Sequence, residues 1–212
     1  GHESVLTPFR NGEADILIGT QMIVKGHDFP NVTLVAALAA DMSLYAGDYR
    51  SSERTFELLM QASGRAGRAE KAGEVVIQTY NPEEYSIQAV AGQDAEYFYE
   101  NELAFRRLMK YPPYSQMAAI LILSEEENEA KILSEKLAEN IHSVCGDAVT
   151  LIGPSKAGLS RAKDRYRYVL YVKSMDEEAM ACVREIAEEA NRRVVNQKTC
   201  SVQYDRDPVN GY

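Results

Sequence analysis

Two arginines, Arg65 and Arg68, stand three residues apart in the segment QASGRAGR, which spans residues 61–68 and follows a stretch with helical spacing of apolar residues. A guanidinium group is planar and always charged, and it can bind two phosphate oxygens at once. Gly64 and Gly67 flank the arginines and permit a tight turn. These residue types at this spacing indicate a phosphate-binding element of a nucleotide-driven motor.

A second segment, GTQMIVKGHD, spans residues 19–28. Thr20 lies where a buried apolar run ends, and the carboxyl edge of a sheet is where a ligand can approach the backbone. Lys25, Gly26 and Asp28 add a cation, a flexible turn and a carboxylate that could orient an arginine or bind a nucleotide. Taken alone, the segment at residues 19–28 fits an ordinary strand-to-helix connection. Residues 64–68 alone fit a solvated helix end. Both segments in this order favour the motor.

Apolar runs and helical patterns alternate through the first ninety residues. Continuous apolar runs are typical of strands buried on both faces, as in parallel sheets. Alternating strands and helices predict parallel pairing with right-handed crossovers, here a partial RecA-like α/β unit. We expect helix 4–10, strands 15–19 and 32–39, helix 51–63 and strand 74–80.

The second half of the chain has a different order. A helix over 94–110 stops at Tyr111-Pro112-Pro113-Tyr114, because a proline pair cannot continue a helix. Beyond this expected hinge, the pattern βαββαβ predicts a ferredoxin-like α+β domain. Its expected parts are strand 116–123, helix 127–144, strand 149–152, a loop over 153–163, strand 166–173, helix 176–195 and strand 199–204. The predicted division is therefore 1–92, a linker at 93–113, and 114–212.

Six cations between residues 155 and 174 oppose a single acid, Asp164. Tyrosines alternate with arginines there, which predicts a strand with rings on one face and guanidinium groups on the other. Rings can stack on bases while arginines hold the backbone of single-stranded nucleic acid. An edge strand with half-buried tyrosines, its arginines paired with acidic helices, explains the pattern equally well. The candidate DNA-binding residues are Lys156, Arg161, Lys163, Arg165, Tyr166, Arg167 and Tyr168.

Composition excludes several classes of protein. The formal charge of −9 argues against a protein that coats nucleic acid by bulk electrostatics. Three cysteines, Cys145, Cys182 and Cys200, lie far apart without metal-ligand spacing, so we expect neither a disulfide framework nor a metal site. No apolar run is long enough to span a membrane and no signal peptide begins the chain, so we expect a cytoplasmic protein without membrane contact.

The segments resemble a known family. Residues 19–32 look like motif V of superfamily 2 helicases, and residues 61–68 look like motif VI. The segments SERTF at 52–56, GEVVIQTYNP at 73–82 and YPPY at 111–114 resemble, more narrowly, primosomal protein N′, the family of PriA-type replication-restart DNA helicases. The resemblance covers nearly the whole chain.

The resemblance implies an ATP-dependent 3′-to-5′ DNA helicase that acts at stalled forks, in replication restart and primosome assembly. Arg68 would be the arginine finger on the γ-phosphate, with Arg65 beside it and Gln61 positioning it. Gly26, Asp28, Gly64 and Gly67 would shape the nucleotide-binding surface between the lobes, and Thr20 and Lys25 would contact DNA. Forked and single-stranded DNA, single-stranded-DNA-binding protein and other primosome proteins are the implied partners.

Two elements of such a motor are absent from the sequence: a glycine-rich phosphate loop and an acidic magnesium motif. The chain therefore resembles a C-terminal fragment, with part of helicase lobe 2 and the C-terminal domain. We expect it to be inactive as an ATPase alone, with ATP, Mg²⁺ and a zinc module belonging to the parent protein. The alternative is a stand-alone module that binds nucleic acid or protein and has no motor role.

Overall fold

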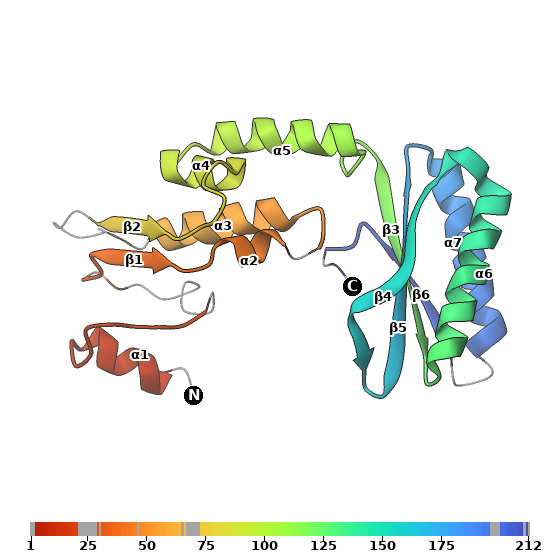
Figure 1. Ribbon diagram of the computed structural model, residues 1–212, viewed down its shortest axis with the longest axis horizontal. Coiled ribbons are helices and arrows are strands. Elements are labelled where there is room, and N and C mark those ends of the chain that lie inside the picture. Colours follow the sequence, from red (N-terminus) through yellow and green to blue (C-terminus); the bar gives the residue numbers. More distant parts are fainter. Residues whose placement is uncertain are drawn as a thin grey trace. The chain divides into compact units, whose positions relative to one another are not determined.

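A computed structural model describes residues 3–20, 29, 31–45, 47–64, 66, 73–195, 200–209 and 211. The chain divides into two compact units, one within residues 1–102 and the other within 103–212. The division falls inside helix α5 (Ala95–Met109), within the stretch that the sequence assigns to the linker (Figure 1). In the described part of the chain, no helix combines the length and the apolar character needed to cross a membrane.

The first unit contains a parallel pair of strands with helices between and after them. Strand β1 (Leu34–Ala37) pairs in parallel with β2 (Glu74–Ile77), so the predicted parallel pairing is confirmed. Two helices, α2 (Asp41–Leu44) and α3 (Ser51–Ser63), connect the strands, and α3 has the predicted bounds. The unit begins with α1 (Glu3–Arg10), and α4 (Tyr85–Gly92) precedes α5.

One expectation for the first unit is wrong, and one of its helices was not expected. Residues 15–19 form no strand, and the side chains of Ile16 and Ile18 are 77% and 87% exposed. A continuous apolar run forms a buried strand only where a neighbouring strand pairs with it, and the described sheet of this unit contains β1 and β2 alone. Helix α4 was not expected. Its signal is Glu84, whose side chain accepts hydrogen bonds from the backbone N–H groups of Ser86 and Ile87.

Helices α3, α4 and α5 share the apolar core of the first unit. Phe56 of α3 and Phe98 of α5 stack with their ring centroids 4.1 Å apart and their planes 1° from parallel. Leu59, Ile87 and Val90 complete the buried cluster. At its edge, the buried carboxylate of Glu102 accepts a 2.6 Å hydrogen bond from the hydroxyl of Tyr85. The helix that leads into residues 61–68 is therefore fixed within a packed core.

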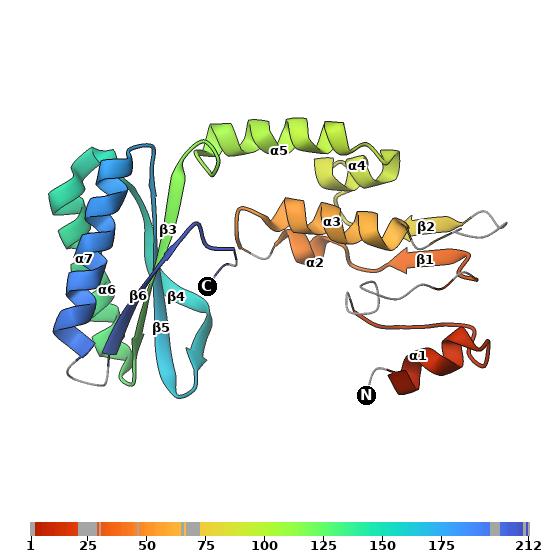
Figure 2. The same ribbon diagram turned by 180° about the vertical axis from the view of Figure 1, so that it is seen from behind.

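The second unit is a four-stranded antiparallel sheet with two long helices on one face (Figures 1 and 2). The strand order β4-β5-β3-β6 and the chain order βαββαβ confirm the ferredoxin-like arrangement. Its elements are β3 (Gln116–Ser124), α6 (Glu127–Cys145), the 3₁₀ turn η2 (Gly146–Ala148), β4 (Thr150–Ala162), β5 (Arg165–Ser174), α7 (Glu177–Val195) and β6 (Cys200–Arg206).

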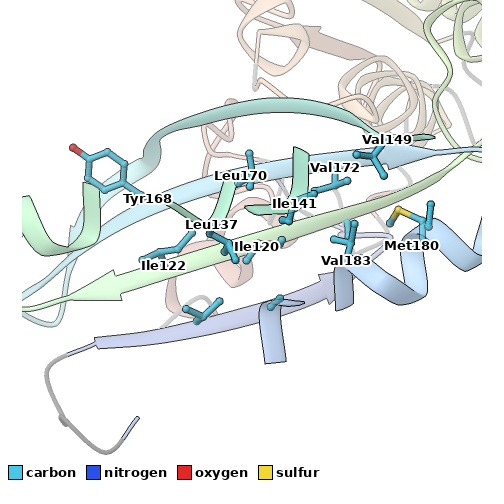
Figure 3. Packing of buried hydrophobic residues seen from close by; sticks show 14 of the residues in the cluster. Ile120, Ile122, Leu137, Ile141, Val149, Tyr168, Leu170, Val172, Met180 and Val183 are labelled. Atoms are coloured by element: carbon cyan, nitrogen blue, oxygen red, sulfur yellow. The ribbon is translucent and has the colours of Figure 1, made fainter. Parts of the chain in front are cut away.

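The core of the second unit lies between its sheet and its helices (Figure 3). Alternate residues of β3 and β5 point into it, because successive side chains of a strand face opposite sides of the sheet. Leu137 and Ile141 of α6 and Met180 and Val183 of α7 meet them there. The buried members from the two central strands are Ala118, Ile120, Ile122, Tyr168, Leu170 and Val172.

The loop expected over residues 153–163 is wrong. Strand β4 continues through Ala162 and pairs with β5 up to a two-residue turn at Lys163 and Asp164. Both turn residues have positive φ, 51° and 59°, which is the backbone twist that a tight hairpin requires. The glycine, proline and serine residues that indicated a loop occupy an edge strand, where two register shifts accommodate them.

Candidate functional site

Helix α3 presents the start of the arginine-rich segment. Its buried residues include Phe56, Leu59 and Ala62, whereas Gln61 and Gly64 lie exposed on its last turn and just beyond it. The backbone N–H of Gly64 donates to the carbonyl of Met60 at 3.0 Å and closes the helix. Arg65, Gly67 and Arg68 lie outside the described residues. The structure thus places only the helix that precedes the two arginines.

The first turn of α3 is held by Asp48. Its carboxylate accepts a 2.7 Å hydrogen bond from the backbone N–H of Arg50 and forms an ion pair with the guanidinium of Arg54. The hydroxyl of Ser51 donates to the backbone carbonyl of Asp48 at 2.7 Å. These contacts fix the backbone just before the helix and tie it to Arg54 in the first turn. Asp48 therefore supports the segment from which α3 begins.

Of the candidate residues in the earlier segment, only Thr20 is described, and it lies exposed in an irregular stretch. Lys25, Gly26 and Asp28 lie outside the described residues. The expected juxtaposition of this segment with residues 61–68 therefore stays a prediction.

Asp41, at the start of α2, is a positioning residue that the sequence analysis missed. Its buried carboxylate accepts hydrogen bonds from the hydroxyl of Thr79 at 2.6 Å and from the backbone N–H of Tyr80 at 2.8 Å. The hydrogen bond from Thr79, reinforced by that from Tyr80, lowers the pKa of Asp41. One carboxylate thereby ties together the segments that follow β1 and β2. A carboxylate directly after an apolar run is the signal that could have found it.

The β4–β5 hairpin gathers most of the candidate DNA-binding cations, because Arg161, Lys163 and Arg165 lie at or beside its turn. The Arg161 side chain is 57% exposed, with Nη2 3.4 Å from Oδ1 of Asp164 and its guanidinium 5.2 Å from the centre of the Tyr166 ring. Lys163 is exposed and Arg165 is half-buried. The structure thus brings together three cations that the sequence separates by one residue each.

Two other candidate cations have partners within the second unit. Nζ of Lys156 lies 2.5 Å from Oε1 of Glu127 at the start of α6, and this hydrogen bond raises the pKa of Lys156. Nη1 of Arg167 donates to the backbone carbonyl of Leu159 at 3.1 Å. The alternative considered above paired the arginines of this strand with acidic helices; the ion pair that the structure shows with a helix is instead that of Lys156.

The predicted separation of rings and arginines on the faces of β5 is confirmed for Tyr166, Tyr168, Arg165 and Arg167, since residues alternate along the strand. The ring face, however, points toward the helices. Tyr168 is only 7% exposed and belongs to the core (Figure 3). Tyr166 packs against the same core. The expectation that this face is open for base stacking is therefore wrong for Tyr168, because its ring fills the space beneath the helices.

Charge is unevenly distributed over the second unit. Helix α6 carries four glutamates and two lysines, and α7 carries five glutamates and three arginines. The hairpin turn carries Arg161, Lys163 and Arg165 beside Asp164. Positive charge is therefore concentrated at the hairpin, whereas each of the two helices carries an excess of acid. Within the described ranges, no group of three or more His, Cys, Asp or Glu side chains could hold a metal ion.

Comparison with known proteins gives a family match for each of the two parts of the chain. Residues 1–70 match the helicase conserved C-terminal domain, and residues 107–209 match the primosomal protein N C-terminal domain. Replication restart protein PriA of Bacillus subtilis is 46% identical over 207 residues, which is 98% of this chain and 26% of that protein.

The similarity extends to more distant bacteria. The PriA protein of Synechocystis is 42% identical over 81% of this chain and 21% of that protein, and the PriA protein of Chlamydia trachomatis is 33% identical over 98% and 27%. The chain spans about a quarter of the length of these relatives. With a helicase C-terminal domain followed by a primosomal protein N C-terminal domain, the chain belongs to the PriA family.

Proposed function

We propose that the chain is the C-terminal part of an ATP-dependent 3′-to-5′ DNA helicase that acts in replication restart. The observation that carries this proposal is the order of the two family matches, a helicase C-terminal domain containing both motif segments and then a primosomal protein N C-terminal domain. The relatives are named as replication restart proteins. A stand-alone binding module does not account for the motif segments at residues 19–28 and 61–68.

In this proposal Arg68 supplies positive charge to the transferring phosphoryl group of ATP, and Arg65 belongs to the same network. Charge develops on the phosphoryl oxygens in the transition state, so a positioned guanidinium lowers the barrier. Gln61 orients the arginines from the end of α3, and Gly64 and Gly67 allow the turn that follows. Thr20 and Lys25 contact the DNA backbone, while Gly26 and Asp28 shape the surface that meets the other lobe.

The support for this role is the way in which α3 is held. Asp48 fixes its first turn, and the stack of Phe56 on Phe98 fixes its middle. Its last turn leaves Gln61 exposed. A catalytic group is effective when its carrier is rigid, because positioning errors of about 1 Å already cost much of the rate. The phosphate loop and the magnesium ligands come from another part of the parent protein, since the chain has no phosphate-loop motif.

The second part of the proposal is that the C-terminal unit contacts DNA through the β4–β5 hairpin. Arg161, Lys163 and Arg165 stand together at its turn, whereas the helical face of the unit is acidic. Cations that meet phosphates fix the register of a protein on DNA. Contacts of the parent protein with single-stranded-DNA-binding protein and other primosome proteins complete the proposed role.

The test uses the full-length parent protein with the substitution Arg68→Ala. DNA-dependent ATP hydrolysis should fall about 10³- to 10⁵-fold, the usual contribution of an arginine finger, while DNA binding is retained. Arg184→Ala, which removes an exposed arginine of α7, is the matched control and should leave hydrolysis unchanged. Unchanged hydrolysis in the Arg68→Ala protein would contradict the role of Arg68 as an arginine finger, whereas a parent protein without DNA-dependent hydrolysis would favour the binding module.

A further inference from the structure

We propose that the β4–β5 hairpin binds the phosphate backbone of duplex DNA, rather than single-stranded DNA by base stacking. This inference rests on the proposed DNA contact of the C-terminal unit and specifies the form of DNA that the hairpin binds. The three tyrosine rings of β5 decide between these two forms of DNA.

All three rings take part in packing, Tyr168 as a buried residue and Tyr166 and Tyr171 as half-buried ones. Tyr168 lies in the helix-side core, and Tyr166 packs against that core with the guanidinium of Arg161 over its ring. Tyr171 packs against the apolar cluster of Leu121 and Val169 on the other face of the sheet. Binding of single strands depends on aromatic faces open to successive bases. On β5 these rings contribute to packing, whereas Arg161 and Lys163 are exposed, so the cations are the groups best placed to meet DNA.

The cations lie on a narrow two-stranded ribbon formed by β4 and β5. Arg161 is directly opposite Tyr166, Ala162 is opposite Arg165, and Lys163 belongs to the two-residue turn. Two paired strands are only about 5 Å apart, so a ribbon of this kind can enter the major groove of B-DNA, which is about 12 Å wide. Cations on both strands and on the turn can then reach phosphates that border the groove.

The hairpin is braced on the face of the sheet away from the helices. Between the paired positions Lys156 and Arg161, β4 carries extra residues, and Ala157 among them is buried in the cluster with Leu121 and Val169. The guanidinium of Arg167 holds the carbonyl of Leu159 in the same segment. A braced hairpin loses little conformational freedom on binding, so its cations are already arranged for a regular ligand such as the duplex backbone.

Duplex DNA also fits the charge of the unit. It carries about one phosphate charge per 1.7 Å of helix axis, and binding through three phosphate contacts should weaken about 40-fold between 50 and 200 mM salt. The acidic excess on α6 and α7 opposes wrapping of a flexible strand around the domain. The ligand is therefore a rigid phosphate array approached by the hairpin alone.

The experiment measures fluorescence anisotropy of the 212-residue chain with a labelled blunt duplex and, separately, a single strand of matched length, at about 50 and 200 mM salt. The hairpin variant combines Arg161→Gln, Lys163→Asn and Arg165→Gln. Asparagine suits the left-handed backbone of residue 163. Lys163→Asn alone is the milder variant, should the triple variant fail to fold. Arg184→Gln with Arg192→Gln and Arg193→Gln removes equal charge from α7 as the control, and Tyr166→Leu removes a ring but keeps apolar packing.

We expect the duplex to bind more tightly than the single strand, to lose at least tenfold in affinity in the triple hairpin variant, and to be unaffected by the α7 control or by Tyr166→Leu. Equal or tighter binding of the single strand, weakened by Tyr166→Leu, would overturn the duplex inference but leave the DNA contact standing. Absence of binding to either DNA at about 50 mM salt would overturn both.

Discussion

The ring of Phe56 lies parallel to that of Phe98, with their centroids 4.1 Å apart, so the helix that leads into the motif VI segment is stacked on the helix that leads out of the first unit. Phe98 is fully buried and Phe56 is 6% exposed. Aromatic pairs of this kind contribute beyond the area that they bury. The stack therefore supports α3 within the described core.

Phe98→Ala should destabilise the first unit by about 3 to 5 kcal/mol, because it leaves a cavity beneath Phe56 and removes the stack. Urea unfolding followed by circular dichroism measures the change. Tyr97→Ala, which removes an exposed aromatic side chain of the same helix, is the control and should change stability by less than about 0.5 kcal/mol. Equal effects of the two substitutions would show that the stack does not support the unit.

Asp41→Asn should destabilise the first unit most at neutral pH. The pKa of Asp41 in the folded protein is below its ordinary value of 3.8, because Thr79 and the backbone of Tyr80 donate to its carboxylate. A lowered pKa contributes stability above the unfolded pKa, and this is lost as the pH falls through the folded value. Thermal unfolding at pH 7 and pH 3 should show the difference between wild type and variant shrinking in acid. A difference independent of pH would refute the carboxylate role.

Lys173 gives the second unit a pH dependence of the same sign in the alkaline range. Its buried ammonium donates to the carbonyl of Met109 at 2.9 Å and lies 4.1 Å from the centre of the Tyr111 ring. Burial, together with the charge of Lys110, lowers the pKa of Lys173 below 10.5. Between the folded and unfolded pKa values the unfolded chain binds more protons, so stability rises with pH.

The stability of wild type relative to Lys173→Met should therefore increase as the pH is raised toward 10.5. Urea unfolding at several alkaline pH values measures it. Lys110→Met removes the neighbouring charge that helps to lower the pKa of Lys173, so this variant should show a weaker dependence on pH than wild type. A difference that stays constant or decreases over this range would contradict the assignment of a lowered pKa to Lys173.

The sequence predicted those elements whose signals are local. Helix α3 follows from the spacing of Phe56 and Leu59, and the βαββαβ order follows from regular apolar periods. The strand expected over residues 15–19 failed because an apolar run does not reveal whether a neighbouring strand pairs with it. The loop expected over 153–163 failed because glycine and proline also occur in irregular edge strands.

The site was predictable in type but only partly in geometry. Alternation along β5 gave the two faces of the strand, but the direction of the tyrosine face depends on which side α6 and α7 cover. The separation of structural cations such as Lys156 from those at the turn depends on a distant partner, Glu127. Asp41 was missed because its partners, Thr79 and Tyr80, lie about forty residues away. The features of the site that the sequence did not predict therefore depend on contacts between segments that are distant in the chain.

The most direct test of the proposed function is ATP hydrolysis by the purified 212-residue chain, with and without DNA, beside the full-length parent protein. We predict no turnover above background for the chain alone, because an arginine finger without a phosphate loop cannot position ATP. For the parent protein we predict DNA-dependent turnover. Turnover that copurifies with the chain and disappears in its Arg68→Ala variant would contradict the claim that the chain is only one part of the motor.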